Sequence, residues 1–179
     1  LGLSKKIGAR ECVVDKLSIK ESRQFFEDNH LDGDVRGSAT YCLRFKDEVV
    51  AAVKIRKPYS KKWKSHLEIA RFASKKNIVV VGGYSKLLSH VRKTHGENLV
   101  SYVDTRFGGV GRYCEEAGMK LDHISKQSFW WTDREHRFNR LYCRAQEGMS
   151  ETEVARSRKL IKIWGCSNLV YVTCSALSP

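Results

Sequence analysis

A strand pattern, a pair of glycines and a helix pattern follow one another between residues 67 and 95, and this unit constrains the fold most. Residues 67–73 (LEIARFA) alternate as a strand does, and residues 78–81 form a short apolar run that ends at Gly82 and Gly83. The residues after the glycines, SKLLSHVRK, have helical spacing. Such a turn lets backbone amides approach an anion such as a pyrophosphate, and it equally suits a plain tight turn.

Strand and helix patterns also alternate on both sides of this unit. Ser18-x-x-Glu21 is a capping box that predicts a helix ending near Asn29. A hairpin, a helix and further strands complete the pattern, at residues 39–46 and 49–55 (hairpin), 99–103 (strand), 110–117 (helix), 119–125 and 127–132 (strands). The predicted order is therefore β-β-β-α-β-α-β-β after an opening helix, which is an α/β arrangement.

The pattern changes after residue 132. Arg137, Arg140 and Arg144 fall on one face of a predicted amphipathic helix. A second capping box at residues 150–153 predicts a helix to about residue 159, and residues 161–174 predict a closing hairpin around a turn at 165–168. We expect residues 1–132 to form a core and residues 133–179 a C-terminal helical and hairpin extension packed on it, in a single domain.

Length and charge define the class of protein. With 179 residues the chain has the size of one domain, and its net charge of +13 favours a polyanionic partner. It contains no apolar run long enough for a membrane span and its start has no signal-peptide pattern, so we expect a cytoplasmic protein without membrane contact. No cysteine pair has zinc-finger spacing, so we expect reduced thiols and no metal site, with a zinc site assembled from distant residues as the alternative. The cysteines are at positions 12, 42, 114, 143, 166 and 174.

A basic loop with interleaved aromatic residues is predicted at residues 56–66 (RKPYSKKWKSH). Cations hold backbone phosphates and aromatic faces stack on exposed bases, whereas a solvated lysine loop is the alternative. The arginine edge of the predicted C-terminal helix adds a second basic element. The predicted nucleic-acid-binding residues are Arg56, Lys57, Tyr59, Lys61, Lys62, Trp63, Lys64, Arg137, Arg140 and Arg144.

The order of these segments resembles the GNAT acyltransferase superfamily. LEIARFA, VVVGGYSKLLSHV and LVSYVDTRFGGVGRYCEEAGMK match in order its central strand, its pyrophosphate-binding turn and helix, and the following strand and helix. The segments NHLDG, EIARF, GGYSK and SYVD resemble more closely the phage Mom-like DNA-modification proteins and the GNAT-like domains associated with phage homing endonucleases. This resemblance implies a mixed, mainly antiparallel central sheet flanked by helices.

The resemblance also implies functional residues. The candidate catalytic residues are His30, Glu68, Arg71, Ser85, Asp104 and Tyr113, and the candidate cofactor-binding residues are Gly82, Gly83, Tyr84, Ser85 and Lys86. The acyl-CoA signature Q/R-x-x-G-x-G/A is absent, because the turn has the sequence VVGGYSK. The donor is therefore unknown, with acyl-CoA or another acyl donor as the options.

The chemistry of these residue types leaves alternatives open. Asp104 ends a predicted buried strand, where a carboxylate serves as a base, a metal ligand or an orienter of an amine. An inward-facing Arg71 needs a partner, and Asp104 is the obvious one. His30 suits a base, a ligand or a surface cap, and Ser85 suits a helix N-cap. Tyr113 either donates a proton to a leaving thiolate, as the resemblance implies, or packs its ring in the core.

Two functions follow from these expectations. The first is a phage-type GNAT-fold transferase that acylates an amine on nucleic acid, with DNA favoured over RNA and Glu68 as the base if Asp104 is not. The alternative is a non-catalytic DNA-binding or targeting domain of a homing-endonuclease-type protein, which the missing acyl-CoA signature favours.

Overall fold

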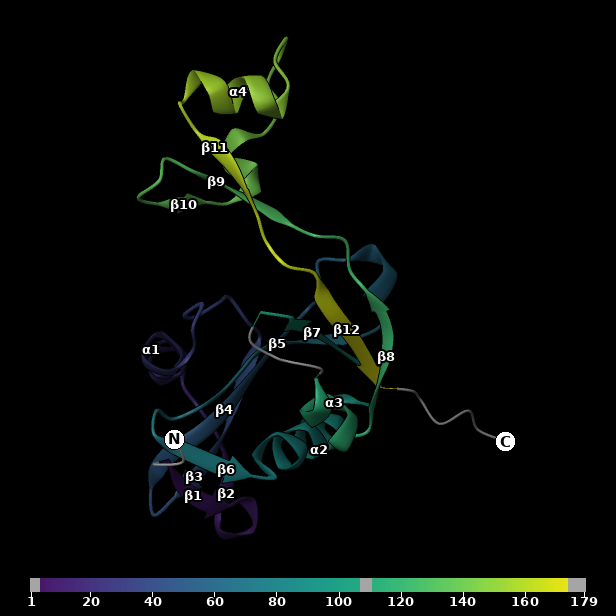
Figure 1. Ribbon diagram of the computed structural model, residues 1–179. Helices are drawn as coiled ribbons and strands as arrows, with labels where there is room; N and C mark the ends of the chain where they lie inside the picture. Colours follow the sequence, from purple (N-terminus) through teal and green to yellow (C-terminus); the bar gives the residue numbers. More distant parts are fainter. Residues whose placement is uncertain (1–3, 107–110, 174–179) are drawn as a thin grey trace, which may run out of the picture.

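A seven-stranded mixed sheet forms the centre of the molecule (Figure 1). The computed structural model describes residues 4–106 and 111–173. Neighbouring strands run antiparallel except β5 and β7, which run parallel, so the expected mainly antiparallel sheet is confirmed. In spatial order the strands are β2 (Val13–Lys16), β3 (Ala39–Phe45), β4 (Glu48–Arg56), β5 (Leu67–Ser74), β7 (Leu99–Asp104), β12 (Asn168–Thr173) and β8 (Met119–Ile124).

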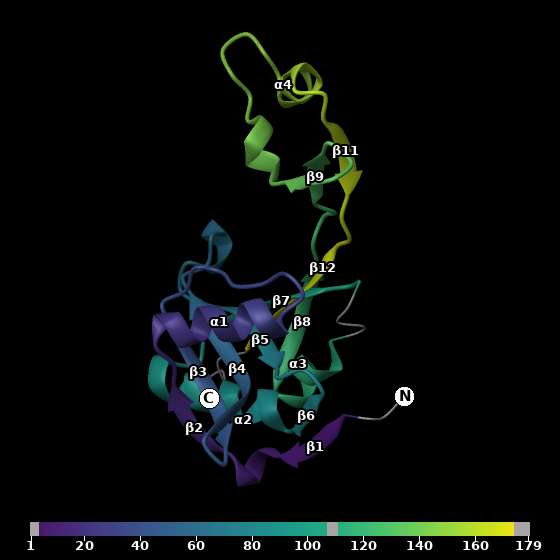
Figure 2. The ribbon, with the colours of Figure 1, turned by 90° about the vertical axis from the view of Figure 1, so that its left-hand side faces the viewer.

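Helices cover both faces of this sheet (Figure 2). α1 (Ile19–Asn29) begins at the predicted Ser18 capping box and packs Phe25 and Phe26 against one face. α2 (Gly83–His95) packs its apolar side against the opposite face, where α3 (Arg112–Glu116) also lies. Strand alternation explains the two layers, because Cys42 of β3 belongs to the first cluster and its neighbour Leu43 to the second. Within residues 4–106 and 111–173, no helix has the length and apolar character needed to span a membrane.

The N-terminal segment packs beside the glycine turn. β1 (Lys5–Gly8) pairs in parallel with β6 (Ile78–Val81), the predicted apolar run that leads into α2. A short 3-10 turn, η1 (Ala9–Glu11), follows β1. A second 3-10 turn, η2 (Lys61–Trp63), lies within the predicted basic loop.

A small lobe of residues 129–164 projects from the main body (Figures 1 and 2). It contains a three-stranded sheet of β10 (Arg137–Phe138), β9 (Phe129–Thr132) and β11 (Ile161–Trp164), together with the 3-10 turn η3 (Arg140–Cys143) and helix α4 (Glu151–Ser157). α4 begins at the predicted second capping box. The lobe has its own apolar core of Trp131, Cys143, Val154, Ala155 and Leu160.

The predicted amphipathic helix after residue 133 is wrong. Arg137 lies in β10, Arg140 begins η3 and Arg144 follows it. Side chains that bond to the nearby backbone explain the difference, because Asp133 accepts from the N–H groups of residues 135 and 136, and the Asn139 side chain accepts from the N–H of Leu141. These local bonds compete with helical ones and start turns instead.

The predicted closing hairpin is also wrong. β11 pairs with β9 in the small lobe, whereas β12 lies between β7 and β8 in the main sheet. The central position buries Val170 and Tyr171 fully, which two strands paired alone at the surface would not achieve. The last strand of the predicted extension thus belongs to the main sheet, and the division at residue 132 stays a prediction.

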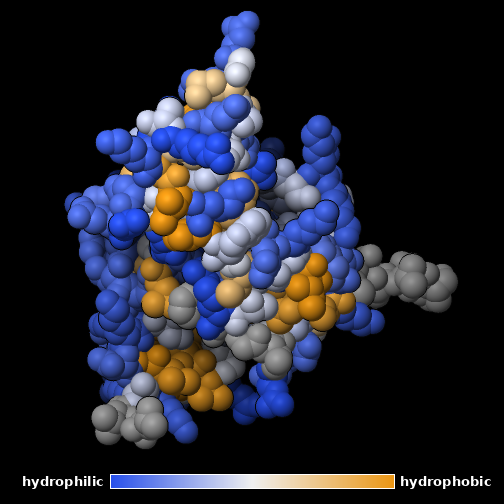
Figure 3. Space-filling view, turned by 45° about the horizontal axis from the view of Figure 1, so that its top comes forward, coloured by the Kyte–Doolittle hydropathy of each residue, from blue (hydrophilic) through white to orange (hydrophobic). Residues whose placement is uncertain are grey.

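The surface of the molecule is mostly hydrophilic in the view of Figure 3, and its hydrophobic residues gather in separate patches. Several of the exposed apolar side chains lie on edge strands, among them Val79 and Val81 of β6 and Leu121 and Ile124 of β8. The charged surface is consistent with the net charge of +13.

Candidate functional site

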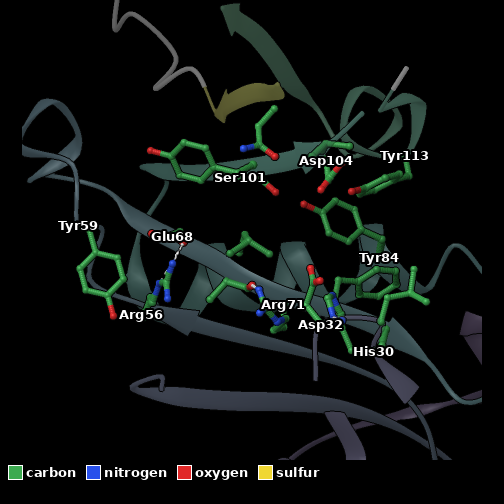
Figure 4. Close-up of a pocket in the computed structure, with 18 of the residues that line it drawn as sticks. His30, Asp32, Arg56, Tyr59, Glu68, Arg71, Tyr84, Ser101, Asp104 and Tyr113 are labelled. Atoms are coloured by element: carbon green, nitrogen blue, oxygen red, sulfur yellow. Dashed lines mark hydrogen bonds and ion pairs between the residues drawn. The ribbon is translucent and has the colours of Figure 1, made fainter. Parts of the chain in front are cut away.

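A cleft opens where the two parallel strands of the main sheet end their pairing. β5 and β7 are paired only over residues 67–69 and 99–101, and the cleft lies along the residues that follow on each strand. This first cavity has a volume of about 730 Å³ (Figure 4). Its polar lining includes His30, Asp32, Glu68, Arg71, Asp104 and Tyr113, so the structure brings together five of the six candidate catalytic residues.

The loop after α1 carries His30 and Asp32 to the cleft, and two cations anchor it. Arg71 Nε donates to the carbonyl oxygen of Gly33 at 3.1 Å. The buried Lys54 forms an ion pair with Asp34 in the same loop. Arg71 thus holds the loop from the sheet side, and the predicted Arg71–Asp104 ion pair is wrong.

The hydrogen bonds of His30 define its tautomer. The backbone N–H of Asp32 donates to His30 Nδ1 at 3.1 Å, so a neutral ring carries its proton on Nε2. Burial, and secondly the charge of Arg71, lower the pKa of His30 below its ordinary value of 6.5. The ring is therefore neutral at pH 7, and its Nε2–H is a hydrogen-bond donor.

Asp104 ends β7 and pairs with Arg106, two residues further on. Arg106 Nε lies 2.9 Å from Asp104 Oδ2, and the backbone N–H of Arg106 donates to Oδ1 at 2.8 Å. The hydrogen bonds from the Arg106 side chain are the main reason that the pKa of Asp104 lies below its ordinary value. Asp104 is thus an ionised acceptor at neutral pH. Asp104 thus pairs with Arg106, which is close in sequence, and not with Arg71, the partner predicted from the sequence.

Aromatic rings form one wall of the first cavity. The ring centroids of Tyr84 and Tyr113 lie 4.8 Å apart in an edge-to-face arrangement, and Phe72 lies 4.9 Å from Tyr84. Burial raises the pKa of Tyr113 well above its ordinary value. Its hydroxyl group is therefore protonated at neutral pH. Cys114 Sγ donates to the hydroxyl of Tyr84 behind this wall, at 3.7 Å.

The glycine turn is engaged by the N-terminal segment. Gly82 is the N-cap of α2 with a φ of 74°, so Ser85 is not the cap. Lys86 Nζ donates to the carbonyl oxygens of Ala9 and Cys12 at 2.9 and 2.6 Å. Of the five predicted cofactor-binding residues only Tyr84 lines the first cavity, and Ser85 lies outside it.

These features do not fit a coenzyme A pyrophosphate. Lys86, the only cation of the turn, is committed to backbone carbonyls, and neither Tyr84 nor Ser85, which follow the two glycines, supplies the glycine or alanine that ends the signature. The roles predicted for Gly82, Gly83, Ser85 and Lys86 stay predictions without support from this geometry.

Residues of the predicted basic loop lie in different surroundings. Arg56 pairs with the buried Glu68, and its guanidinium lies 4.5 Å from the ring centroid of the exposed Tyr59. Trp63 is buried against Val100 and Val170, so its ring is not exposed for stacking on a base. Lys62 pairs with Asp122, and the side chains of Lys57, Lys61 and Lys64 are exposed.

A second cavity of about 530 Å³ lies between the main sheet and the small lobe. It shares Asp32, Arg71 and Asp104 with the first cavity, so the two adjoin at the polar cluster. Trp130 and Arg137 line it from the lobe. We did not predict Trp130 from the sequence; its place in the FWWT strand was the only signal. Arg140 pairs with Glu151 and Arg144 is exposed.

Within the described ranges, no group of three or more His, Cys, Asp or Glu side chains is arranged to hold a metal ion. The described cysteines, 12, 42, 114, 143 and 166, are free thiols; Cys174 lies outside the described residues. Residues 107–109 of the segment LVSYVDTRFGGVGRYCEEAGMK also lie outside the described residues, as does residue 110, the first residue of the predicted helix.

No protein-family model matches the chain, and no curated protein matches it. Solved structures do match. The ribosomal-protein-S18-alanine N-acetyltransferase from Escherichia coli aligns with a TM-score of 0.55 at 9% identity, over 94% of this chain and 98% of that one. Naa50 from Arabidopsis thaliana, in complex with a bisubstrate analogue, aligns with a TM-score of 0.54 at 12% identity, over 92% and 99%.

A GNAT-family acetyltransferase from Streptococcus pneumoniae aligns with a TM-score of 0.53 at 11% identity, over 91% of this chain and 98% of that one. At such low identity these matches show the fold alone. The chain therefore has a GNAT-like fold, as the sequence predicted. The matches do not test the narrower resemblance to phage proteins.

Proposed function

We propose that this GNAT-fold chain is an acyl-group transferase whose acceptor is an amino group of nucleic acid. One observation carries the proposal: His30, Arg71, Asp104 and the protonated Tyr113 line the same cleft between β5 and β7. Acyl transfer to an amine needs an acceptor for the amine proton, a donor to the carbonyl oxygen and a donor to the leaving group. The cleft contains a group suited to each task.

The transfer is a substitution at the carbonyl carbon of an activated acyl donor. The amine nitrogen attacks this carbon, the N–C bond forms, and the surplus amine proton passes to the ionised carboxylate of Asp104. The Nε2–H of neutral His30 donates to the carbonyl oxygen as negative charge develops there. The bond to the leaving group then breaks, and Tyr113 supplies its proton. Solvent restores Asp104 and Tyr113.

Arg71 is a positioning residue in this scheme. Its bond to the carbonyl of Gly33 holds the loop that presents His30 and Asp32. The donor belongs to the class of activated acyl compounds, a thioester or another. Because residues 82–86 do not fit a pyrophosphate, no step depends on an anion bound at that turn.

The nucleic-acid acceptor is supported by charge and by resemblance. The net charge of +13 favours a polyanion, and exposed lysines of the basic loop lie on the chain segment that leads into β5. The resemblance to Mom-like proteins favours DNA over RNA and a base amine as the target. An enzyme that acts on a base takes it out of the stack or uses a single strand.

A second function is favoured by the glycine turn. A turn closed by the N-terminal segment and by Tyr84 suits a GNAT-like domain that binds DNA without chemistry, as in the domains associated with homing endonucleases. The polar cluster in the cleft favours the transferase over this alternative.

The test is intact nucleoside mass spectrometry of DNA and RNA from cells that express the protein, an Asp104→Asn variant or an Asp122→Asn control. Asp122 is a surface carboxylate that pairs with Lys62 outside both cavities. The expected result is a new nucleoside mass with wild type and control and its loss with Asp104→Asn. An unchanged nucleoside profile, with salt-sensitive DNA binding retained by all three proteins, would favour the binding domain.

A further inference from the structure

The second cavity contains Trp130 and Arg137, which no part of the proposed chemistry uses. Trp130 and Arg137 line one side from the small lobe, while Asp32, Arg71 and Asp104 line the side that it shares with the first cavity. Its volume of about 530 Å³ lies within the usual range of small-molecule sites. The cavity therefore has an aromatic and cationic outer part and a polar inner end.

We propose that the second cavity binds one unstacked, amino-bearing base of a single nucleic-acid strand, with its ring on Trp130 and an adjacent phosphate at Arg137. Binding itself needs no chemistry; that the amine then reacts at Asp104 rests on the proposed function. The small lobe is thus the acceptor subsite, and the first cavity is left for the donor.

Strand alternation places Trp130 on the cavity side of the lobe. Its neighbour Trp131 is buried in the lobe core with Cys143 and Val154, so Trp130 faces the other way. Arg137, on the adjacent strand β10, holds its guanidinium 5.4 Å from the centroid of the Trp130 ring. A stacking ring beside an arginine is the arrangement that single-strand binding proteins use for base and backbone.

The polar end favours bases that carry an amino group. The carboxylates of Asp32 and Asp104 accept hydrogen bonds from an exocyclic amine, and Arg71 lies beside them as a donor to ring nitrogens or carbonyl oxygens. Adenine, cytosine and guanine offer an exocyclic amine, whereas thymine offers none. We therefore expect thymine to bind more weakly at this position.

The experiment titrates the protein into a short single-stranded DNA that carries one 2-aminopurine, whose fluorescence falls when it stacks, and into its RNA counterpart. The variants are Trp130→Leu and, as a control in the same lobe, Trp164→Leu, which removes an exposed tryptophan outside both cavities. We expect quenching with wild type and Trp164→Leu, loss of quenching with Trp130→Leu, and an affinity about tenfold lower for that variant. Unlabelled oligonucleotides with adenine should compete better than those with thymine.

Equal quenching by Trp130→Leu and wild type, or equal loss with Trp164→Leu, would overturn the proposal. If Trp130→Leu fails to fold by circular dichroism, Arg137→Gln decides, with the exposed Arg156→Gln of α4 as control. Only Arg137→Gln should weaken binding. Trp130-dependent quenching without a modified nucleoside would refute the transferase and leave this subsite standing; a modified nucleoside with normal quenching by Trp130→Leu would do the reverse.

Discussion

Glu68 carries a carboxylate into the interior of the sheet with 5% of its surface exposed. Arg56 compensates this charge by donating from Nε to Glu68 Oε1 at 3.0 Å. Arg56, which the sequence predicted to contact nucleic acid, is therefore engaged in an internal ion pair. Since a buried charge is costly without its partner, the pair contributes to the fold whether or not it contacts a ligand.

Replacing Arg56 with leucine should lower the free energy of unfolding by about 3 kcal/mol, because it leaves the Glu68 carboxylate buried and unpaired. The double variant Arg56→Leu/Glu68→Leu removes both charges and should recover part of that loss. Urea denaturation of the two single variants and the double variant measures the coupling. A double variant that loses the sum of the two single effects would show that the pair makes no such contribution.

Substitution of His30 should change how stability depends on pH. The folded-state pKa of His30 lies below its ordinary value of 6.5, so as the pH falls through that value the unfolded chain binds a proton that the folded chain does not. The free energy of unfolding of the wild type should therefore fall from pH 6.5 down through the folded pKa. In His30→Asn, whose amide oxygen keeps an acceptor for the N–H of Asp32, this component should be absent. Urea denaturation at several pH values tests this, and parallel curves would contradict it.

The sequence allowed us to place the candidate residues at the cleft but not to identify their partners. Asp104 ends β7 and Arg71 follows the paired part of β5, and the strand patterns predicted both of these strands. Their partners depend on local geometry: Arg106 closes on Asp104 from two residues away, and Arg71 turns to the carbonyl of Gly33. The alternation of apolar and polar residues along a strand does not predict such loop contacts.

At the level of elements, periodic segments were predictable and turn-rich ones were not. α1, the β3–β4 hairpin, α2 and α4 follow capping boxes and apolar spacing directly. The stretch after residue 132 misled prediction because arginines at helical spacing say nothing about the side-chain bonds of Asp133 and Asn139 that start turns. β11 and β12 were predictable as strands, but their partners lie far away in sequence.

Gly111 determines how α3, which carries Tyr113, meets the main sheet. It has a φ of 67°, and a Cβ added there would lie 2.5 Å from Tyr171 Cε2. Gly111→Ala should therefore cost both backbone strain and displacement of a fully packed ring, about 3 kcal/mol in all. It should also reduce the proposed transferase activity by moving Tyr113.

Gly148→Ala is the matched control, because Gly148 has a φ of 75° but nothing within 4 Å of the added Cβ. It should cost only the strain, about 1 kcal/mol. Thermal unfolding of both variants separates the two contributions. Equal shifts in Tm would show that Tyr171 yields without cost.

At the scale of the whole molecule, the path of the chain couples the small lobe to the cleft. The chain leaves the main sheet after β8, builds the lobe, and returns as β12 between β7 and β8 (Figure 1). The lobe is thus attached to the main sheet through the neighbouring strands β8 and β12. β12 also pairs with β7, the strand that ends in Asp104. This placement, which no local pattern encodes, creates the second cavity with Trp130. The arginines of the lobe and the basic loop at residues 56–66 together form a candidate surface for binding a polyanion.

The basic loop should account for a measurable part of the salt dependence of nucleic-acid binding. Lys57, Lys61 and Lys64 have exposed side chains on the chain segment next to Tyr59, which lines the first cavity. If each contacts one phosphate of a single strand, replacing all three with glutamine should reduce the slope of log K against log salt by about 2, since each contact releases about 0.7 counterions.

The control changes the same net charge elsewhere, with Lys20, Lys93 and Lys120 replaced by glutamine. These lysines are exposed on α1, α2 and β8, and none lines either cavity. Fluorescence anisotropy at a series of salt concentrations gives the slope for both triple variants and the wild type. Because both triple variants have a net charge lower by three, a slope that falls equally in both would mean that binding follows the overall charge and that residues 57–64 form no specific contact.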